Sequence, residues 1–97
     1  MDLAGFEASL EQTAAPRGLP PALVGLWHAL RGEWDLAHEA VQPLDAACSW
    51  VHAVLHREEG DLSNARYWYR RAGRPQGSGD PHEEYRAVVA ALLAEDA

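Results

Sequence analysis

This chain of 97 residues contains no lysine, so its eight basic residues are all arginines. Fifteen acidic residues outnumber them, and the formal net charge is −7 at pH 7. A general nucleic-acid binder needs a basic face to hold phosphates, which a chain with this balance does not readily offer. We therefore expect no nucleic-acid partner.

Cysteine, long apolar runs and a secretion signal are also scarce or missing. Cys48 is the single cysteine, so no internal disulfide can form, and a reducing compartment fits best. No apolar run approaches the length of a membrane span, and the first residues lack the basic and apolar regions of a signal peptide. We expect a cytoplasmic protein without a membrane partner.

Alternation with a period of two residues, which marks half-buried strands, is missing as well. Apolar residues instead recur at helical spacing, and proline, glycine and capping residues separate the segments. We predict a single all-α domain over residues 1–97. The six expected helices cover residues 3–14, 20–31, 33–42, 45–59, 62–72 and 81–92, with a flexible linker over residues 73–80.

Two parts of the chain match each other at a constant offset of 28 residues. The matched pairs are Leu23 with Val51, His28 with His56, Gly32 with Gly60, Trp34 with Leu62, and Ala37 with Ala65. A fixed period with shared turn residues indicates a repeated helix–turn–helix unit. We predict two helix hairpins that superpose with Gly32 on Gly60.

The repeat resembles the tetratricopeptide family, in which small residues and an aromatic residue surround a turn glycine. Those places are filled by Ala53, Gly60, Ala65, Tyr69 and Ala72 in the second unit, and by Gly25, Gly32, Ala37, Val41 and Leu44 in the first. The resemblance covers about residues 21–75, with a period shorter than the usual ~34 residues. It implies a stack of two helix–turn–helix units with capping helices at both ends. It also implies a concave face that holds a protein or peptide.

Two details qualify this resemblance. His28 and His56 stand where the family has a large aromatic residue, four positions before the turn glycine. In addition, residues 62–74, LSNARYWYRRAGR, are similar to a string found in small bacterial proteins of unassigned function. That second similarity implies no activity.

Histidines form the sharpest candidate site. His52 and His56 are four residues apart and therefore project from one face of a helix. His28 occupies the repeat position equivalent to His56, so three imidazoles can approach one another, as a zinc or other transition-metal site requires. The alternative is that the rings replace buried aromatics and are neutral and hydrogen-bonded between helices. No HExxH or paired CxxC motif is present, and we predict the structural role, with no metal and no cofactor.

Arginines form a second candidate surface on the helix expected over residues 62–72. Arg66 and Arg70 share one face, where their forked guanidinium groups can hold a phosphate, a carboxylate or an acidic peptide. The alternative is a solvated stripe that pairs with Glu58, Glu59 and Asp61.

Apolar residues on the second and fourth helices need a cover. Under tetratricopeptide registration, Leu26, Leu30, Trp50 and Val54 face the groove, and Trp27 adds a further large contact area on the second helix. An apolar face of this kind is covered by a second chain, by the last helix or by a ligand. Of these we favour a homodimer.

We find no set of catalytic residues. Cys48 has apolar neighbours and no basic group nearby in sequence, and no serine lies in a nucleophile elbow. Our leading prediction is a non-catalytic helical-repeat module that binds a protein or peptide, or associates with itself. The alternative is a small metal- or ligand-binding protein that uses the histidines. An enzyme has no support beyond the histidines themselves.

Overall fold

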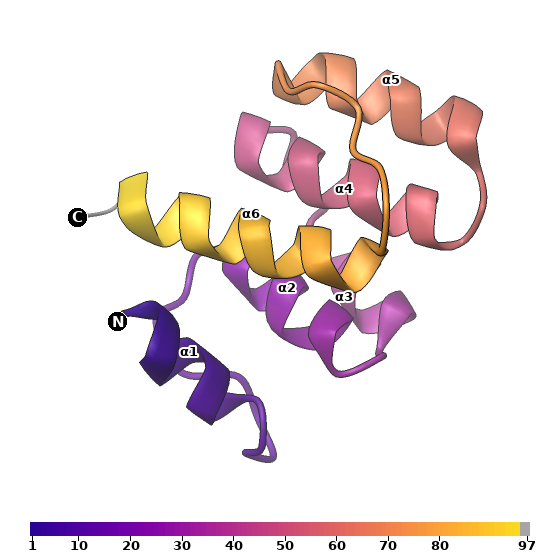
Figure 1. Ribbon diagram of the computed structural model, residues 1–97. Coiled ribbons are helices and arrows are strands. Elements are labelled where there is room, and N and C mark those ends of the chain that lie inside the picture. The colour runs from indigo at the N-terminus through magenta and orange to yellow at the C-terminus, as the bar shows by residue number, and fades with distance from the viewer. Residues whose placement is uncertain (96–97) are drawn as a thin grey trace.

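The computed structural model describes residues 1–95, and their regular structure is entirely helical (Figure 1). The helices are α1 (Leu3–Ser9), α2 (Pro21–Leu30), α3 (Trp34–Ala40), α4 (Ala46–Glu58), α5 (Leu62–Ala72) and α6 (Pro81–Glu95). No strand occurs among these residues, which confirms the predicted all-α class. Over the same range, no helix combines the length and apolar character that crossing a bilayer requires.

Aspartate caps set the beginnings of three helices. Asp2, Asp45 and Asp61 each accept a hydrogen bond from the backbone amide three residues further on, at the start of α1, α4 and α5. Each bond satisfies an amide that has no partner inside its own helix. These caps are local in sequence, so the predicted starts agree with the structure.

The predicted end of the first helix is wrong, because α1 stops at Ser9 rather than near residue 14. The Ser9 hydroxyl donates back to the Phe6 carbonyl, and the Trp27 indole nitrogen lies 3.1 Å from that hydroxyl and 3.3 Å from the Ser9 carbonyl oxygen. These bonds compete with the pairing that a longer helix would need at this point.

The two turn glycines have the same geometry. Gly32 and Gly60 have φ angles of 78° and 90°, in the left-handed region where glycine is favoured. In each turn the residue after the glycine donates its backbone amide to a histidine carbonyl at 2.9 Å, and this histidine lies four positions before the glycine. The helices on either side differ in length, however, with 10 and 7 residues around Gly32 but 13 and 11 around Gly60.

Small residues lie where the helices of each hairpin approach each other. A Cβ atom added to Gly25 of α2 would overlap the Val41 side chain and lie 3.3 Å from the Ala37 carbonyl oxygen. In the second hairpin, Ala53 and Ala65 are fully buried. Larger side chains at these positions would force the helices apart.

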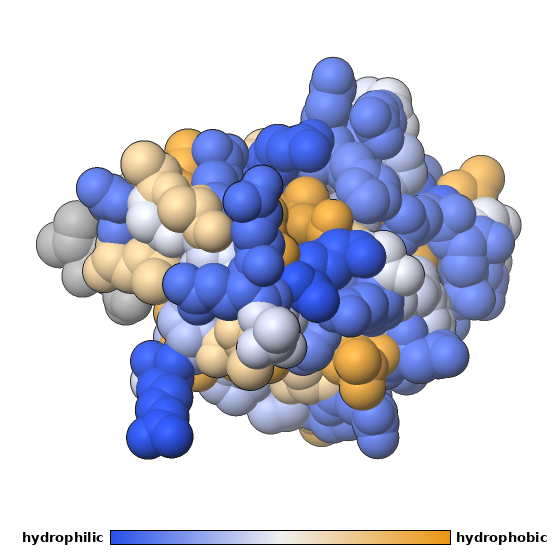
Figure 2. Space-filling model, turned by 90° about the horizontal axis from the view of Figure 1, so that it is seen from below, coloured by the Kyte–Doolittle hydropathy of each residue, from blue (hydrophilic) through white to orange (hydrophobic). Residues whose placement is uncertain are grey.

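Helix α6 covers the apolar faces of α2 and α4 (Figure 1). Leu26 and Val54, which we expected to face an open groove, are fully buried in one core with Val88 and Val89 of α6. The last helix therefore provides the cover, and this face no longer argues for a homodimer. On the face shown in Figure 2, apolar side chains are scattered among hydrophilic ones rather than gathered in one patch.

The glycine-rich stretch 73–80 is tied to α4 and α6. Arg57 donates to the Gly79 carbonyl at 2.8 Å and to the Glu84 carboxylate at 2.6 and 3.0 Å. The Tyr69 hydroxyl of α5 donates to the same carboxylate at 2.8 Å. With Arg57 and Glu84 only 9% and 13% exposed, the Glu84 carboxylate joins three helices, and Arg57 holds the end of the linker at Gly79.

Candidate functional site

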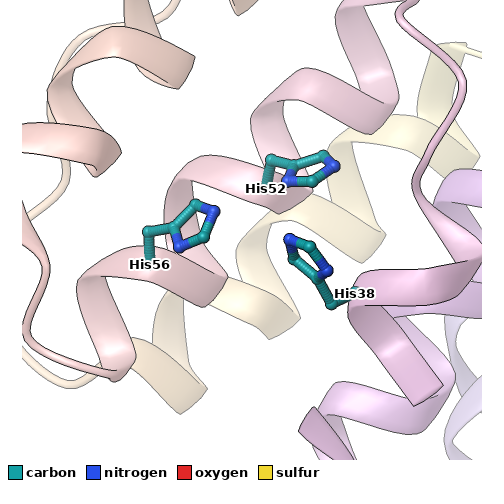
Figure 3. A group of neighbouring side chains, drawn as sticks. All are labelled: His38, His52 and His56. Atoms are coloured by element: carbon teal, nitrogen blue, oxygen red, sulfur yellow. The ribbon is translucent and has the colours of Figure 1, made fainter. Parts of the chain in front are cut away.

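Three histidines from two helices meet on one side of α4 (Figure 3). His38 projects from α3, while His52 and His56 project from α4 one turn apart, with the three rings turned toward one another. Each ring offers one nitrogen, and these nitrogens all lie within 4.8 Å of one another. His52 and His56 are buried, at 3% and 7% exposure, and His38 is half-buried. We call these three residues the histidine triad.

The triad differs from the one that the sequence suggested. His28 does not join it, because its Nδ1 lies 2.9 Å from the Glu33 carboxylate and its ring meets the edge of Trp27. His38 takes the place of His28, and sequence reasoning missed it. The sequence did contain one indication of His38. The connection between α3 and α4 is short, so a histidine near the end of α3 can lie against α4.

Two tryptophan rings stack on two of the three histidines of the triad. Trp34 stacks on His38 with centroids 5.0 Å apart, and Trp68 stacks on His52 with centroids 4.1 Å apart. The Trp34 indole nitrogen also donates to the Leu55 carbonyl at 2.8 Å, which fixes that ring against α4. The rings therefore have little freedom to turn away from one another.

Burial keeps two of the three imidazoles neutral. Burial first, and then the neighbouring His38 and His56, lowers the pKa of His52 to about 4. Burial first, and then His56, also lowers the pKa of His38. Since metal ions bind the neutral ring, neither residue must lose a proton near neutral pH before it can act as a ligand.

The ring nitrogens of His56 and His52 have different partners. His56 Nδ1 lies 2.6 Å from the Glu59 carboxylate, so when it donates there the lone pair remains on Nε2. Within residues 1–95, His52 Nδ1 is buried and has no hydrogen-bond partner. At this nitrogen the structure departs from our prediction that each buried imidazole is hydrogen-bonded, although a hydrogen bond with the Val41 backbone acts on the pKa of the same ring and raises it. An orphaned buried polar atom costs roughly 1–3 kcal/mol, and a metal ion or a donor group would satisfy it.

The other candidate residues lie elsewhere. Trp27 is buried, with its indole nitrogen on Ser9, and is therefore part of the core. Trp50 is half-buried, and the Arg74 guanidinium lies 4.0 Å from its ring centroid. Arg66 and Arg70 are exposed on α5.

The alternative pairing proposed for the arginines is wrong. Glu58 accepts a hydrogen bond from Tyr85 and lies against His82. Glu59 lies against His56, and Asp61 caps α5. These carboxylates are thus engaged away from Arg66 and Arg70.

Cys48 fits its predicted structural role. It is fully buried, and burial first, followed by the nearby Asp45 carboxylate, raises the pKa of its thiol to about 12. A thiol in this state is a poor nucleophile and a poor metal ligand.

No protein-family model, curated protein or solved structure matches the chain. Its function must therefore be inferred from the chemistry of its own side chains.

Proposed function

We propose that this protein binds a divalent transition-metal ion through His38, His52 and His56. The observation that carries the proposal is the approach of three ring nitrogens to within 4.8 Å of one another. Zinc–nitrogen bonds of about 2.0–2.1 Å place two ligands of a tetrahedral ion roughly 3.3 Å apart. Small rotations of the rings would therefore close the site.

The surroundings of the triad suit such an ion. Imidazole ligands without a thiolate favour zinc, copper, nickel and cobalt over calcium and magnesium, which prefer oxygen. The Glu59 carboxylate on His56 Nδ1 resembles the outer partner that orients most metal-bound histidines. Because His38 is half-buried, a water molecule or another small ligand can reach a fourth position from its side.

Zinc binding tests the proposal directly. We expect elemental analysis and calorimetry near pH 7.5 to give one zinc per chain, and His38→Ala to weaken binding by at least about tenfold. His38 is the ligand of choice because it is the least buried of the three, so its loss should leave the helices intact by circular dichroism. His28→Ala is the matched control and should retain zinc.

A stability measurement provides a second readout. An ion that joins α3 to α4 binds only the folded chain, so zinc at 100 times its dissociation constant should stabilise the protein by about 2.7 kcal/mol. At the same zinc concentration, a tenfold weakening by His38→Ala should reduce this gain to about 1.4 kcal/mol or less. If the folded protein fails to take up zinc, or if His38→Ala and His28→Ala lose it equally, the triad is not a metal site.

A second candidate function is the binding of a protein or peptide partner by a tetratricopeptide-like stack. In that proposal α2–α3 and α4–α5 are the two repeat units, and α1 and α6 are the capping helices. Its support is a set of large apolar side chains that are 45–66% exposed: Leu36, Leu44, Leu62 and Tyr67. Since α6 lies over α2 and α4, a partner would meet α3 and α5 rather than the concave face that the resemblance implies.

Leucine-to-serine variants distinguish this second function. We expect Leu62→Ser to weaken capture of a partner from lysate, or self-association measured by light scattering. Leu3→Ser, at another exposed leucine on α1, is the control and should change neither. Equal effects of the two variants, or none, would rule out this surface.

A further inference from the structure

Arginines at intervals of four residues line a small pocket at the end of α5. Arg66, Tyr69, Arg70, Arg74 and Gln76 surround a volume of about 140 Å³. We call this the arginine pocket. It is formed by α5 and the start of the linker, and none of its lining residues belongs to the histidine triad.

The charges of this pocket are largely uncompensated. Among residues 1–95, Arg66 and Arg70 take part in no ion pair, although the chain as a whole carries a net charge of −7. The acidic residues just before α5 are bound to other groups, as described above. Two adjacent guanidinium groups repel each other, so an anion between them would be stabilised by both.

Other walls of the pocket are already held in place. The Arg74 guanidinium lies over Trp50, with 4.0 Å to the ring centroid, and its Nη2 donates to the Glu95 carboxylate at 2.9 Å. The Tyr69 hydroxyl is fixed by Glu84. Because Arg74 and Tyr69 are already held in place, they lose less conformational freedom when an anion binds beside them.

We propose that the arginine pocket binds a phosphate group. The planar forks of arginine match phosphate oxygens with paired hydrogen bonds, and a dianion would balance the charges of Arg66 and Arg70. A volume of about 140 Å³ is well below the roughly 300–1,000 Å³ of sites for larger ligands. The pocket thus fits a single phosphoryl group better than a nucleotide.

Two sources can supply this chemistry, namely free phosphate and a phosphorylated serine or threonine of a partner protein. Recognition of phosphorylated segments by arginine clusters is a recurrent mode of binding. A partner's phosphoryl group would enter the pocket while its neighbouring residues contact the exposed face of α5.

Nuclear magnetic resonance of the arginine side chains tests the proposal on metal-free protein. We expect inorganic phosphate to shift the Nε–Hε signals of Arg66, Arg70 and Arg74 with a single saturating dissociation constant. Arg70→Gln should weaken that binding by about tenfold, as expected for the loss of a charge-assisted bond. Arg86→Gln removes an exposed arginine on α6 and should change the affinity less than about twofold.

A second titration distinguishes free phosphate from a phosphorylated partner as the natural ligand. It uses a phosphoserine peptide and a control peptide in which glutamate replaces the phosphoserine. Tighter binding of the phosphopeptide than of phosphate, weakened by Arg70→Gln, identifies a partner protein as the source. Equal affinities identify the free anion. The proposal is overturned if phosphate leaves these signals unshifted, or if Arg86→Gln weakens binding as much as Arg70→Gln does. Neither result bears on zinc binding, which is measured without phosphate.

Discussion

Acid should destabilise this protein in part through His52. In the folded state its pKa is lowered from 6.5 to about 4, whereas in the unfolded chain it returns to its ordinary value near 6.5. Between about pH 6.5 and pH 4, His52 therefore binds a proton in the unfolded chain but stays neutral in the folded chain. The resulting stability is fully present above pH 6.5 and is lost as the pH falls toward 4.

The size of the effect follows from the shift. A shift from 6.5 to about 4, at about 1.4 kcal/mol per pKa unit, gives a total of roughly 3 kcal/mol, most of which is lost by pH 4.5. His52 is 3% exposed, so solvent screening reduces this little. Against a total stability of about 5–15 kcal/mol for a domain, the change is easily measured.

The assay is urea unfolding of metal-free protein at about pH 7.5 and pH 4.5, on the natural chain and on His52→Leu. Groups that titrate alike in both proteins cancel when the two are compared. We expect the natural chain to lose roughly 2–3 kcal/mol more than the variant between these pH values. An equal loss in both proteins would show that His52 is not held neutral in the fold.

Two further predictions concern packing and charge. Gly25→Ala should destabilise by about 1–3 kcal/mol, because its Cβ would overlap Val41; a higher urea midpoint, as for glycine replacement in an exposed helix, would disprove the close approach. Glu84→Ala should lower the free energy of unfolding by about 3–5 kcal/mol, because it leaves the charge of the nearly buried Arg57 without its carboxylate partner. The exposed neighbour Glu83 is the control, and its change to alanine should alter the unfolding free energy by no more than about 0.5 kcal/mol. Similar values for the two glutamates would contradict the role given to Glu84.

The helices could largely be predicted because most of their ends are encoded locally. Aspartate caps and turn glycines act within a few residues of the boundary, and Asp45, Asp61, Gly32 and Gly60 all do so in the structure. The end of α1 could not be found in this way, because it depends on Trp27, which is 18 residues distant from Ser9.

The site was harder to predict than the helices. The spacing of His52 and His56 was enough to bring those two rings together, since both lie on one helix. The third ligand depends on which helix packs beside α4, and the internal repeat pointed to His28 instead of His38. For the arginines, the sequence placed Arg66 and Arg70 correctly on one face. The contacts that occupy Glu58 come from His82 and Tyr85 of α6, which only the fold brings near, whereas the contact of Glu59 with His56 is local and could have been anticipated.

The stacking of indoles on the triad has an optical consequence. Trp68 lies on His52, and Trp34 lies on His38. An excited indole transfers an electron readily to a protonated imidazole but poorly to a neutral one, so the fluorescence of each tryptophan depends on the charge of the histidine beside it. The chain also contains Trp27 and Trp50, so these two are replaced with phenylalanine together with either Trp34 or Trp68, and the emission that remains then follows a single indole of the triad. The protein thus reports the charge state of its own site without an added label.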